Sequence, residues 1–400
     1  MAPMDTLYLI DRSAQIIQAE VADEYMSYQT RKRLMGIPEY RDAHTSLMAN
    51  LRQDSRFTAR EGALAVHGMW ESFNAKTAAH WLGSRARVVG AAEAYANLER
   101  FLTSSSFPYT IFVAVSGVFT DHDVQFGQTL WLRHSRDVLP EALLPHGLLR
   151  SLSHLPTMAF EEKRLQPIRL HRESDGSGPF IKAPLESDDV LLCLTLVRPP
   201  ATPFLVGLAC QPDDWVPLEG YFNFPRSLEA SGHQTRLGRD HTQLAQMIYD
   251  RVRGLSPSAK DKVRLPLRRL NTSMRRRDEA DSAIDLGIAL ESLVLGGVET
   301  EKKYQAALRC AFFLGQDAES RRRIYHLAGE VYHLRNRAVH RGTLKESDLN
   351  NRYKGKAIRE VLEDASQLVA DALKQFIEAG AKEPDWDALV LGPLEGPQVT

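Results

Sequence analysis

The chain has 400 residues, which favours two or three domains, and its hydrophobic fraction of 43% is ordinary for a globular protein with a real core. Its 50 Lys and Arg residues balance 51 Asp and Glu residues. This balance excludes a strong overall field toward nucleic acid, so any affinity for nucleic acid has to come from a local basic patch.

The cysteines and the N-terminus indicate the compartment. Cys193, Cys210 and Cys310 are far apart in the sequence and match neither a disulfide framework nor a zinc spacing. The N-terminal MAPMDTLYLIDRSAQ lacks the basic and apolar regions of a secretory signal, and no apolar run approaches the roughly 20 residues that span a bilayer. We therefore expect a cytoplasmic protein without a membrane partner.

The first half, residues 1–238, has a mixed pattern. PYTIFVAVSGVF (108–119) is a β-rich run broken by Gly117, and VLLCLTLVRPPATPFLVGLAC (190–210) predicts two buried strands joined by a proline-rich connection. AAEAYANLERFL (91–102) predicts a helix, and HRESDGSGPF (171–180) a loop. We expect an α/β domain with antiparallel strands, a sensor or regulator whose trigger is unknown.

Residues 239–380 carry helical periodicity throughout. Helix stops follow at Gly296-Gly297, Gly315 and Gly342, and the segment 358–376 has a sustained apolar stripe. This pattern predicts an all-α bundle, so that the whole chain is α+β. A tail, 381–400, contains Pro and Gly, and is expected to pack along the surface or stay loose.

Two charged residues fall on apolar helix faces. Glu291 lies in the middle of the face formed by Ile284, Ile288 and Leu295, and Arg335 lies on the apolar face of the later helix. A buried charge is costly unless it is paired. We expect Glu291 and Arg335 to approach each other or to line a wet cleft, the alternative being a purely structural ion pair.

Arg335, Asn336 and His340 supply a fixed cation, an amide and a titratable imidazole. On an ideal helix, Arg335 and His340 are about 140° apart and do not share a face. Three arrangements remain: the helix ends near Asn336, the helix is distorted, or the groups meet across a subunit interface. The alternative role of His340 is a cation favourable to the dipole at the helix C-terminus.

The RNRAVH segment, 335–340, resembles the R-x4-6-H signature of the HEPN family of helical nucleases and nucleotide-binding domains, in which Asn, Asp or His usually follows the arginine. DSAIDLGIALESLVLGG, KYQAALRCAFFLG and YHLRNRAVHRG are similar in order and spacing to the ApeA-like branch of that family. The resemblance covers roughly residues 240–380 and leaves the first half unexplained.

The resemblance implies a metal-independent endoribonuclease in which the RNA 2′-hydroxyl attacks the neighbouring phosphate. His340 would act as general acid or base, Arg335 would stabilise charge on the phosphate, Asn336 would orient either group, and Glu291 would support Arg335. It also implies a homodimer through the HEPN domain, open to higher assembly. Expected substrates include tRNA, and the expected role is a toxin or antiviral defence by abortive infection.

One position departs from the family pattern. HEPN toxins controlled by nucleotidyl transfer often carry a tyrosine two residues after the histidine, where this chain has Gly342. That form of control is therefore not expected here.

A basic run, KDKVRLPLRRLNTSMRRRDEAD (260–281), could hold an RNA backbone through contacts that weaken with salt. The expected RNA-binding residues are all arginines: Arg268, Arg269, Arg275, Arg276, Arg277 and Arg341. The alternative is a solvated face of the bundle's first helices.

Other site types are less favoured. Asp121-His122-Asp123 together with His134, His146 and His154 invite a metal, but their spacings match no usual ligand pattern, so neither a metal nor another cofactor is expected. Two rivals to the nuclease stay open. They are a non-catalytic HEPN module for dimerisation or nucleotide binding, and an RNA-binding regulator.

Overall fold

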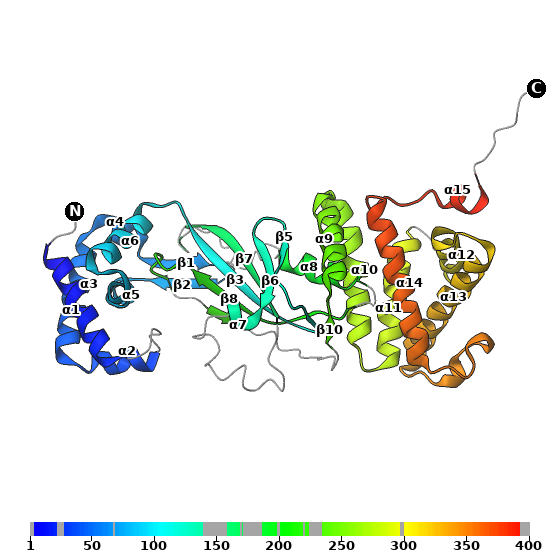
Figure 1. The fold of residues 1–400 in the computed structure, drawn as a ribbon, viewed down its shortest axis with the longest axis horizontal. Coiled ribbons are helices and arrows are strands. Elements are labelled where there is room, and N and C mark those ends of the chain that lie inside the picture. Colours follow the sequence, from blue (N-terminus) through cyan, green and yellow to red (C-terminus); the bar gives the residue numbers. More distant parts are fainter. Residues whose placement is uncertain are drawn as a thin grey trace, which may run out of the picture.

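The computed structural model shows an elongated molecule with helices at both ends and a sheet between them (Figure 1). The residues that it describes are 4–21, 28–66, 69–138, 158–168, 170, 186–197, 201–218, 221–223, 234–296 and 300–392. The chain is mixed α/β, with antiparallel sheets and a C-terminal helical region, as predicted for the coarse fold.

The N-terminal end is a group of helices around one hairpin. The helices are α1 (Met4–Glu20), α2 (Tyr28–Met35), α3 (Pro38–Gln53), α4 (Ser55–Arg60), α5 (Ala75–Val89) and α6 (Ala91–Thr103). The antiparallel hairpin is formed by β1 (Gly62–Val66) and β2 (Met69–Phe73). The helix predicted over 91–102 is therefore confirmed as α6. The other N-terminal helices were not predicted.

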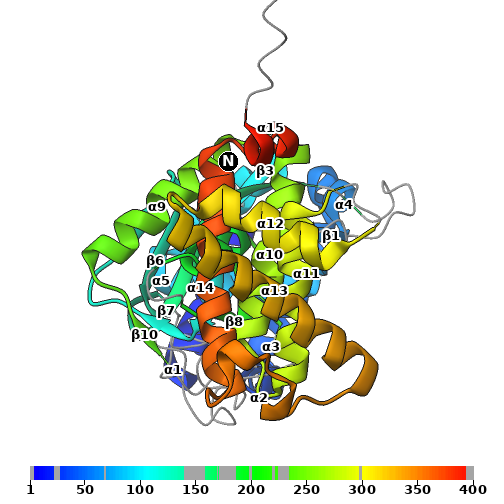
Figure 2. The same cartoon turned by 90° about the vertical axis from the view of Figure 1, so that its right-hand side faces the viewer.

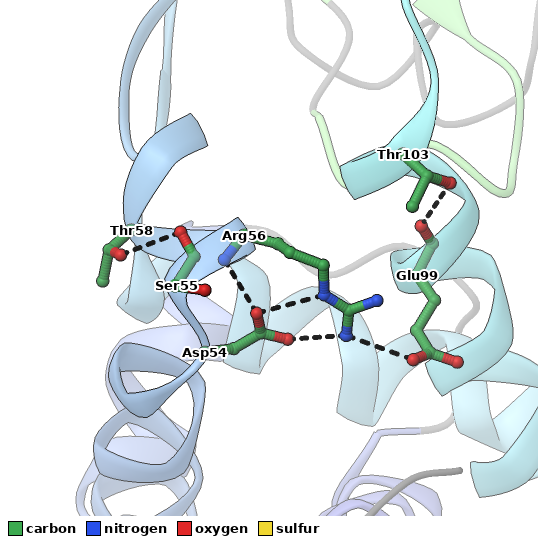
Figure 3. A network of polar contacts seen from close by, with 6 residues as sticks. All are labelled: Asp54, Ser55, Arg56, Thr58, Glu99 and Thr103. Carbon is green, nitrogen blue, oxygen red and sulfur yellow. Dashed lines mark hydrogen bonds and ion pairs between the residues drawn. The ribbon is translucent and has the colours of Figure 1, made fainter.

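A polar cluster holds α4 against α6 (Figure 3). Asp54 caps α4 by accepting a hydrogen bond from the Arg56 backbone, and the Arg56 guanidinium lies 2.7 Å from Asp54 Oδ2 and 3.2 Å from Glu99 Oε1. The hydrogen bond from Arg56 lowers the pKa of Asp54. Because Arg56 is exposed, each pair contributes little to stability, but together they fix the orientation of a very short helix.

The central sheet has six strands in the order β5-β6-β7-β3-β8-β9, with every neighbour antiparallel. Its strands are β5 (Val124–Phe126), β6 (Leu130–His134), β7 (Met158–Pro167), β3 (Ser106–Ser116), β8 (Phe204–Pro212) and β9 (Tyr221–Asn223). A short parallel pair joins β4 (Val118–Phe119) to β10 (Thr235–Arg236), and α7 (Ser135–Val138) follows β6.

The predicted break at Gly117 is confirmed. Gly117 separates β3 from β4 with a φ of 85°, a conformation that favours glycine. A Cβ built there would lie 2.1 Å from the carbonyl oxygen of Thr202, so both backbone geometry and space require glycine.

Of the two strands predicted over 190–210, the prediction of the first is wrong and that of the second is confirmed. Its first part is helix α8 (Glu186–Leu194), whereas its second part is strand β8. The apolar run Val190–Leu194 is buried on every side, so its hydrophobicity has no helical period, and a short run of that kind cannot be distinguished from a buried strand. The signal that favours a helix is the acidic first turn, with Glu186, Asp188 and Asp189.

The C-terminal region is helical, as predicted (Figure 2). Its helices are α9 (Arg239–Gly254), α10 (Pro257–Arg275), α11 (Glu279–Val294), α12 (Lys302–Leu314), α13 (Ala318–Arg341), α14 (Ile358–Glu378) and α15 (Trp386–Leu391), with short 3-10 turns η4 (Glu346–Asp348) and η5 (Asn351–Tyr353). Gly315 and Gly342 are the C-caps of α12 and α13, and Gly296 follows the end of α11.

Contacts between α8 and α10 join this region to the sheet. Arg264 on α10 donates two hydrogen bonds to the Asp189 carboxylate on α8, at 2.9 and 2.8 Å. Buried side chains on both sides of residue 238 belong to one continuous hydrophobic cluster. The domain boundary between residues 238 and 239 therefore stays a prediction.

The described part of the predicted tail packs on α12. The Trp386 ring is buried, its centroid lies 5.9 Å from that of Phe313, and Arg309 stacks 5.0 Å above it. Residues 393–400 and the predicted loop 171–180 lie outside the described residues.

Two further observations concern the cysteines and membrane-spanning helices. The three cysteines are free and buried. Within the ranges given above, no helix has both the length and the apolar character needed to cross a bilayer.

Candidate functional site

Helix α13 carries the three residues of the R-x4-H segment. Its start is fixed by a capping box between Asp317 and Ser320, and it ends at Gly342, whose φ is 71°. The helix is continuous to Arg341, so the helix neither ends near Asn336 nor departs from α geometry before His340. Two of the three arrangements considered for this segment are therefore wrong, and a meeting across a subunit interface remains.

The predicted approach of Glu291 and Arg335 is confirmed. Helix α13 packs across α11, and Arg335 Nη2 lies 3.4 Å from Glu291 Oε2. Arg335 Nη1 donates a second hydrogen bond, at 2.9 Å, to Asn336 Oδ1. The Arg335 and Glu291 side chains are 26% and 22% exposed. The guanidinium therefore lies at the edge of the helix interface, where it is held and still reachable.

This ion pair leaves hydrogen-bonding capacity unused. Glu291 Oε1 and Arg335 Nε are both buried and have no hydrogen-bond partner in the protein. Buried polar atoms are nearly always satisfied by protein, water or ligand. The pair therefore contains one buried acceptor and one buried donor whose hydrogen bonds the protein does not supply.

Gly287 makes room for the Arg335 side chain, a role that the sequence reasoning missed. A Cβ at residue 287 would lie 2.5 Å from Arg335 Cγ and 2.8 Å from Arg335 Cβ. Gly287 precedes Glu291 by four residues, so both lie on the face of α11 that meets α13. The available signal was a glycine in the interior of an otherwise apolar helix, which often marks close packing.

Tyr332 is a second residue that the sequence reasoning missed. Its buried ring lies 5.7 Å from the Arg335 guanidinium, in a cation–π contact. Burial, a hydrogen bond to Glu291 and the charge of Glu291 raise the pKa of Tyr332 to about 12. Its hydroxyl therefore stays protonated near neutral pH and helps to hold the carboxylate that holds Arg335.

His340 is exposed, and within one chain it does not join Arg335. Five residues along an α-helix separate the two by about 7.5 Å of rise and about 140° of rotation. Asn336 lies between them, because it is bonded to Arg335 and precedes His340 by four residues on the same face. Val339, which is 53% exposed, also lies on this arc. The arc is therefore a mixed polar and apolar surface.

Several of the predicted RNA-binding arginines make contacts within the protein. Arg269 Nη1 and Arg276 Nε bind the two oxygens of Asp285 at 2.7 and 3.1 Å, and Arg275 lies 5.5 Å from the Phe204 ring. These contacts give the three arginines a structural role.

The remaining members of the predicted set are exposed. Arg268 and Arg277 face solvent, and Arg341 pairs with Asp348 at 2.9 Å near the end of α13. Contact of this set with RNA stays a prediction, carried best by Arg268 and Arg277.

Of the residues that the sequence offered as metal ligands, those that the structure describes lie around one pocket. Asp121, His122, Asp123 and His134 line it. His122 is hydrogen-bonded to threonines, while both aspartates pair with arginines. No cluster of three potential metal ligands occurs in the part of the chain that the structure describes, which does not include His146 or His154.

The chain was also compared with protein-family models, curated proteins and solved structures, and none of the three comparisons finds a match. The chemistry of the α11–α13 site therefore has to be argued from its own residues.

Proposed function

We propose that the C-terminal region is a HEPN-type, metal-independent endoribonuclease. The observation that carries the proposal is the setting of Arg335. It is held by Glu291, Asn336 and Tyr332, its side chain stays partly exposed, and its buried Nε has no partner in the protein. A structural ion pair has no need of Asn336 in line with an exposed His340.

In the proposed reaction, a base removes the proton from the RNA 2′-hydroxyl, and the 2′-oxygen attacks the adjacent phosphorus. The P–O5′ bond breaks, the leaving 5′-oxygen takes a proton, and the products are a 2′,3′-cyclic phosphate and a 5′-hydroxyl. His340 transfers these protons, because an imidazole can both accept and donate a proton and this one is exposed to the substrate. Arg335 stabilises the pentavalent phosphate by charge-assisted hydrogen bonds, and Asn336 orients it.

The site is completed by a second copy of the chain. Arg335 and His340 diverge on one helix, but two α13 helices packed through the arc that contains Val339 bring Arg335 of one copy toward His340 of the other. Burial of the exposed Val339 would favour this packing. Higher assembly is compatible with the same interface.

The proposed setting is the cytoplasm of a bacterium, with RNA cleavage as a toxin activity or as antiviral defence by abortive infection. The proposed substrates include tRNA. The first half of the chain would then recognise the trigger or restrain the nuclease. This role follows the resemblance to ApeA-like proteins stated above.

Cleavage of tRNA and total RNA by the purified protein in EDTA tests the proposal. Wild-type protein is expected to cleave, and Arg335→Ala and His340→Ala to lose cleavage by at least about 100-fold, as expected for loss of a general acid–base or of a charge-stabilising donor. Arg323→Ala is the matched control, because Arg323 is exposed near the start of the same helix. RNA binding without cleavage would favour the RNA-binding regulator. A protein that neither binds nor cleaves RNA would favour the non-catalytic module.

Mixing the two inactive variants tests the shared site. A dimer of one Arg335→Ala chain and one His340→Ala chain retains one complete site only if the two residues come from different copies. Co-purified mixed dimers are therefore expected to recover up to half of the wild-type rate. No recovery in a verified mixed dimer would contradict a site shared between copies.

A further inference from the structure

A pocket of 680 Å³ opens beside the candidate site, between the N-terminal turn of α12, helix α13 and the turn η5. Its walls are rich in aromatic side chains: Tyr304, Tyr325, His326, Tyr332 and Tyr353. Ligand pockets in proteins are typically apolar concavities with a few polar groups at defined places. This one has a size and a lining that fit a nucleotide.

Tyr304 and Tyr325 are the rings of this group that we expect a ligand to contact. Tyr304 is 49% exposed, and its ring centroid lies 6.4 Å from that of Tyr325 in an edge-to-face arrangement. An accessible tyrosine face is a usual platform on which an unstacked base of single-stranded RNA stacks. Gly329 on α13 faces α12, where an added Cβ would be at ordinary contact distances from Ala307 and Lys303, so no side chain of residue 329 fills this part of the pocket.

The rim of the pocket favours a phosphate. Lys302, Lys303 and Arg352 are exposed there, against the exposed Glu301. The N-terminal turn of α12 adds its positive dipole end at the same place. The other carboxylate of the lining, Glu330, is buried and accepts two hydrogen bonds from Asn350, so it is already compensated.

The charge of the rim also acts on His326. Burial lowers the pKa of His326, and the positive charges of Arg352 and Arg322 lower it further. This direction agrees with a locally positive surface.

The pocket is continuous with the candidate site along α13. Tyr332 lines the pocket and also contacts the Arg335 guanidinium. On the same helix, Gly329, Asn336 and His340 follow at spacings of seven and four residues, which place them on one face. An RNA strand with its scissile phosphate at the candidate site can therefore extend along this face to the pocket.

We propose that the α12–α13 pocket is a base-binding subsite for the RNA substrate. An unstacked base lies against the tyrosine rings, and a phosphate next to it contacts Lys302, Lys303 and Arg352. The proposal rests on the ribonuclease function above and adds how the enzyme recognises its substrate, as a single-stranded RNA segment with a base that can be splayed out.

Binding of a short, fluorescein-labelled single-stranded RNA with 2′-O-methyl groups tests the subsite, because this probe cannot undergo attack by its own 2′-oxygen. Fluorescence anisotropy is expected to show that Tyr304→Ala with Tyr325→Ala raises the Kd at least about fivefold, the lower limit for loss of one base–aromatic contact. Tyr8→Ala is the matched control, because Tyr8 is exposed on α1 at the other end of the molecule.

A second double variant tests the expected phosphate contacts and leaves the tyrosines unchanged. Lys302→Glu with Lys303→Glu changes only exposed side chains and is expected to weaken binding and to reduce its salt dependence. An unchanged Kd in both double variants would overturn the proposal.

Competition with adenosine monophosphate distinguishes a pocket that binds a base of the RNA substrate from a pocket that binds a free nucleotide. If the monophosphate binds through the same tyrosines while the RNA affinity is unchanged by their loss, the pocket is a site for a free nucleotide and the proposal is overturned. Because the probe is not cleaved, these outcomes are independent of the cleavage assay. An inactive wild-type enzyme would instead contradict the ribonuclease proposal.

Discussion

Helix α11 carries two carboxylates that pair with arginine, and the pairs differ in kind. Asp285 is 2% exposed, and each of its oxygens binds an arginine at a short distance. Glu291, six residues later, is partly exposed, has one longer contact to Arg335 and one buried oxygen without a partner. The first pair is a closed structural bridge between α10 and α11, whereas the second is an open site.

The difference teaches how to interpret charged residues on helices of this chain. Arg269 and Arg276 belong to a basic run, yet the structure uses both to neutralise one buried carboxylate. Arg335 stands among apolar residues, yet its guanidinium stays partly exposed and makes only one longer contact, at 3.4 Å, with its carboxylate. The number of cations in a segment is therefore a weaker guide to a site than the contacts and exposure of each cation.

The largest expected effect is the loss of the closed bridge. Arg269→Ala with Arg276→Ala leaves the Asp285 carboxylate buried without its cations, and we expect the free energy of unfolding to fall by about 3 kcal/mol. Urea denaturation measures this change. Arg268→Ala with Arg277→Ala is the control on exposed arginines, and equal losses in the two double variants would remove the distinction between the pairs.

A second buried polar cluster gives a stability effect that depends on pH. His80 bonds Tyr40 at 2.8 Å and packs against His44, and burial, followed by the charge of His44, lowers the pKa of His80 to about 3. In the unfolded chain, His80 takes up a proton below its ordinary pKa of 6.5, whereas in the folded protein it stays neutral. The contribution of neutral His80 to the free energy of unfolding is therefore fully present above pH 6.5 and is lost progressively toward pH 3.

The expected loss from His80 is about 2 kcal/mol between pH 7 and pH 5, since one pKa unit corresponds to about 1.4 kcal/mol. Hydrogen exchange of α3 and α5 measures it, and His80→Gln removes the titrating group. The same pH slope in His80→Gln would contradict the assignment to this histidine.

Gly287→Ala sharpens the comparison through packing alone. The new Cβ overlaps the Arg335 side chain, and overpacking of this kind costs about 1 kcal/mol or more. We expect that modest destabilisation together with a loss of RNA cleavage, because the guanidinium is displaced. Gly254→Ala is the matched control, since no atom lies within 4 Å of its added Cβ. Full cleavage by Gly287→Ala would show that the position of Arg335 does not matter.

Glu291→Gln is expected to have the smallest effect on stability, below about 1 kcal/mol, because partly exposed ion pairs contribute little. Its effect on cleavage is expected to be larger than that of Asp285→Asn at equal folded fraction. Thermal unfolding followed by cleavage assays of the folded protein compares the two. The reverse order would exchange the roles assigned to the carboxylates.

Much of this arrangement could be predicted from the sequence. The predictable parts are those that a hydrophobic period or a glycine at the end of an element marks. The apolar faces that contain Glu291 and Arg335 predicted their contact, and Gly117 and Gly342 predicted ends of elements. Helix α8 could not be separated from a strand, because burial on all sides removes the period. The role of Gly287 depends on which helix crosses α11, and the direction of His340 depends on where α13 ends, so both required the three-dimensional structure.

The most direct test of the ribonuclease assignment is the chemistry of the cleaved ends. RNA is incubated in EDTA with wild-type protein, Arg335→Ala and His340→Ala, and the products are analysed by mass spectrometry. The account predicts 2′,3′-cyclic phosphate and 5′-hydroxyl ends from the wild-type protein and no such products from either variant. Ends with a 3′-hydroxyl, or unchanged cleavage by His340→Ala, would contradict it.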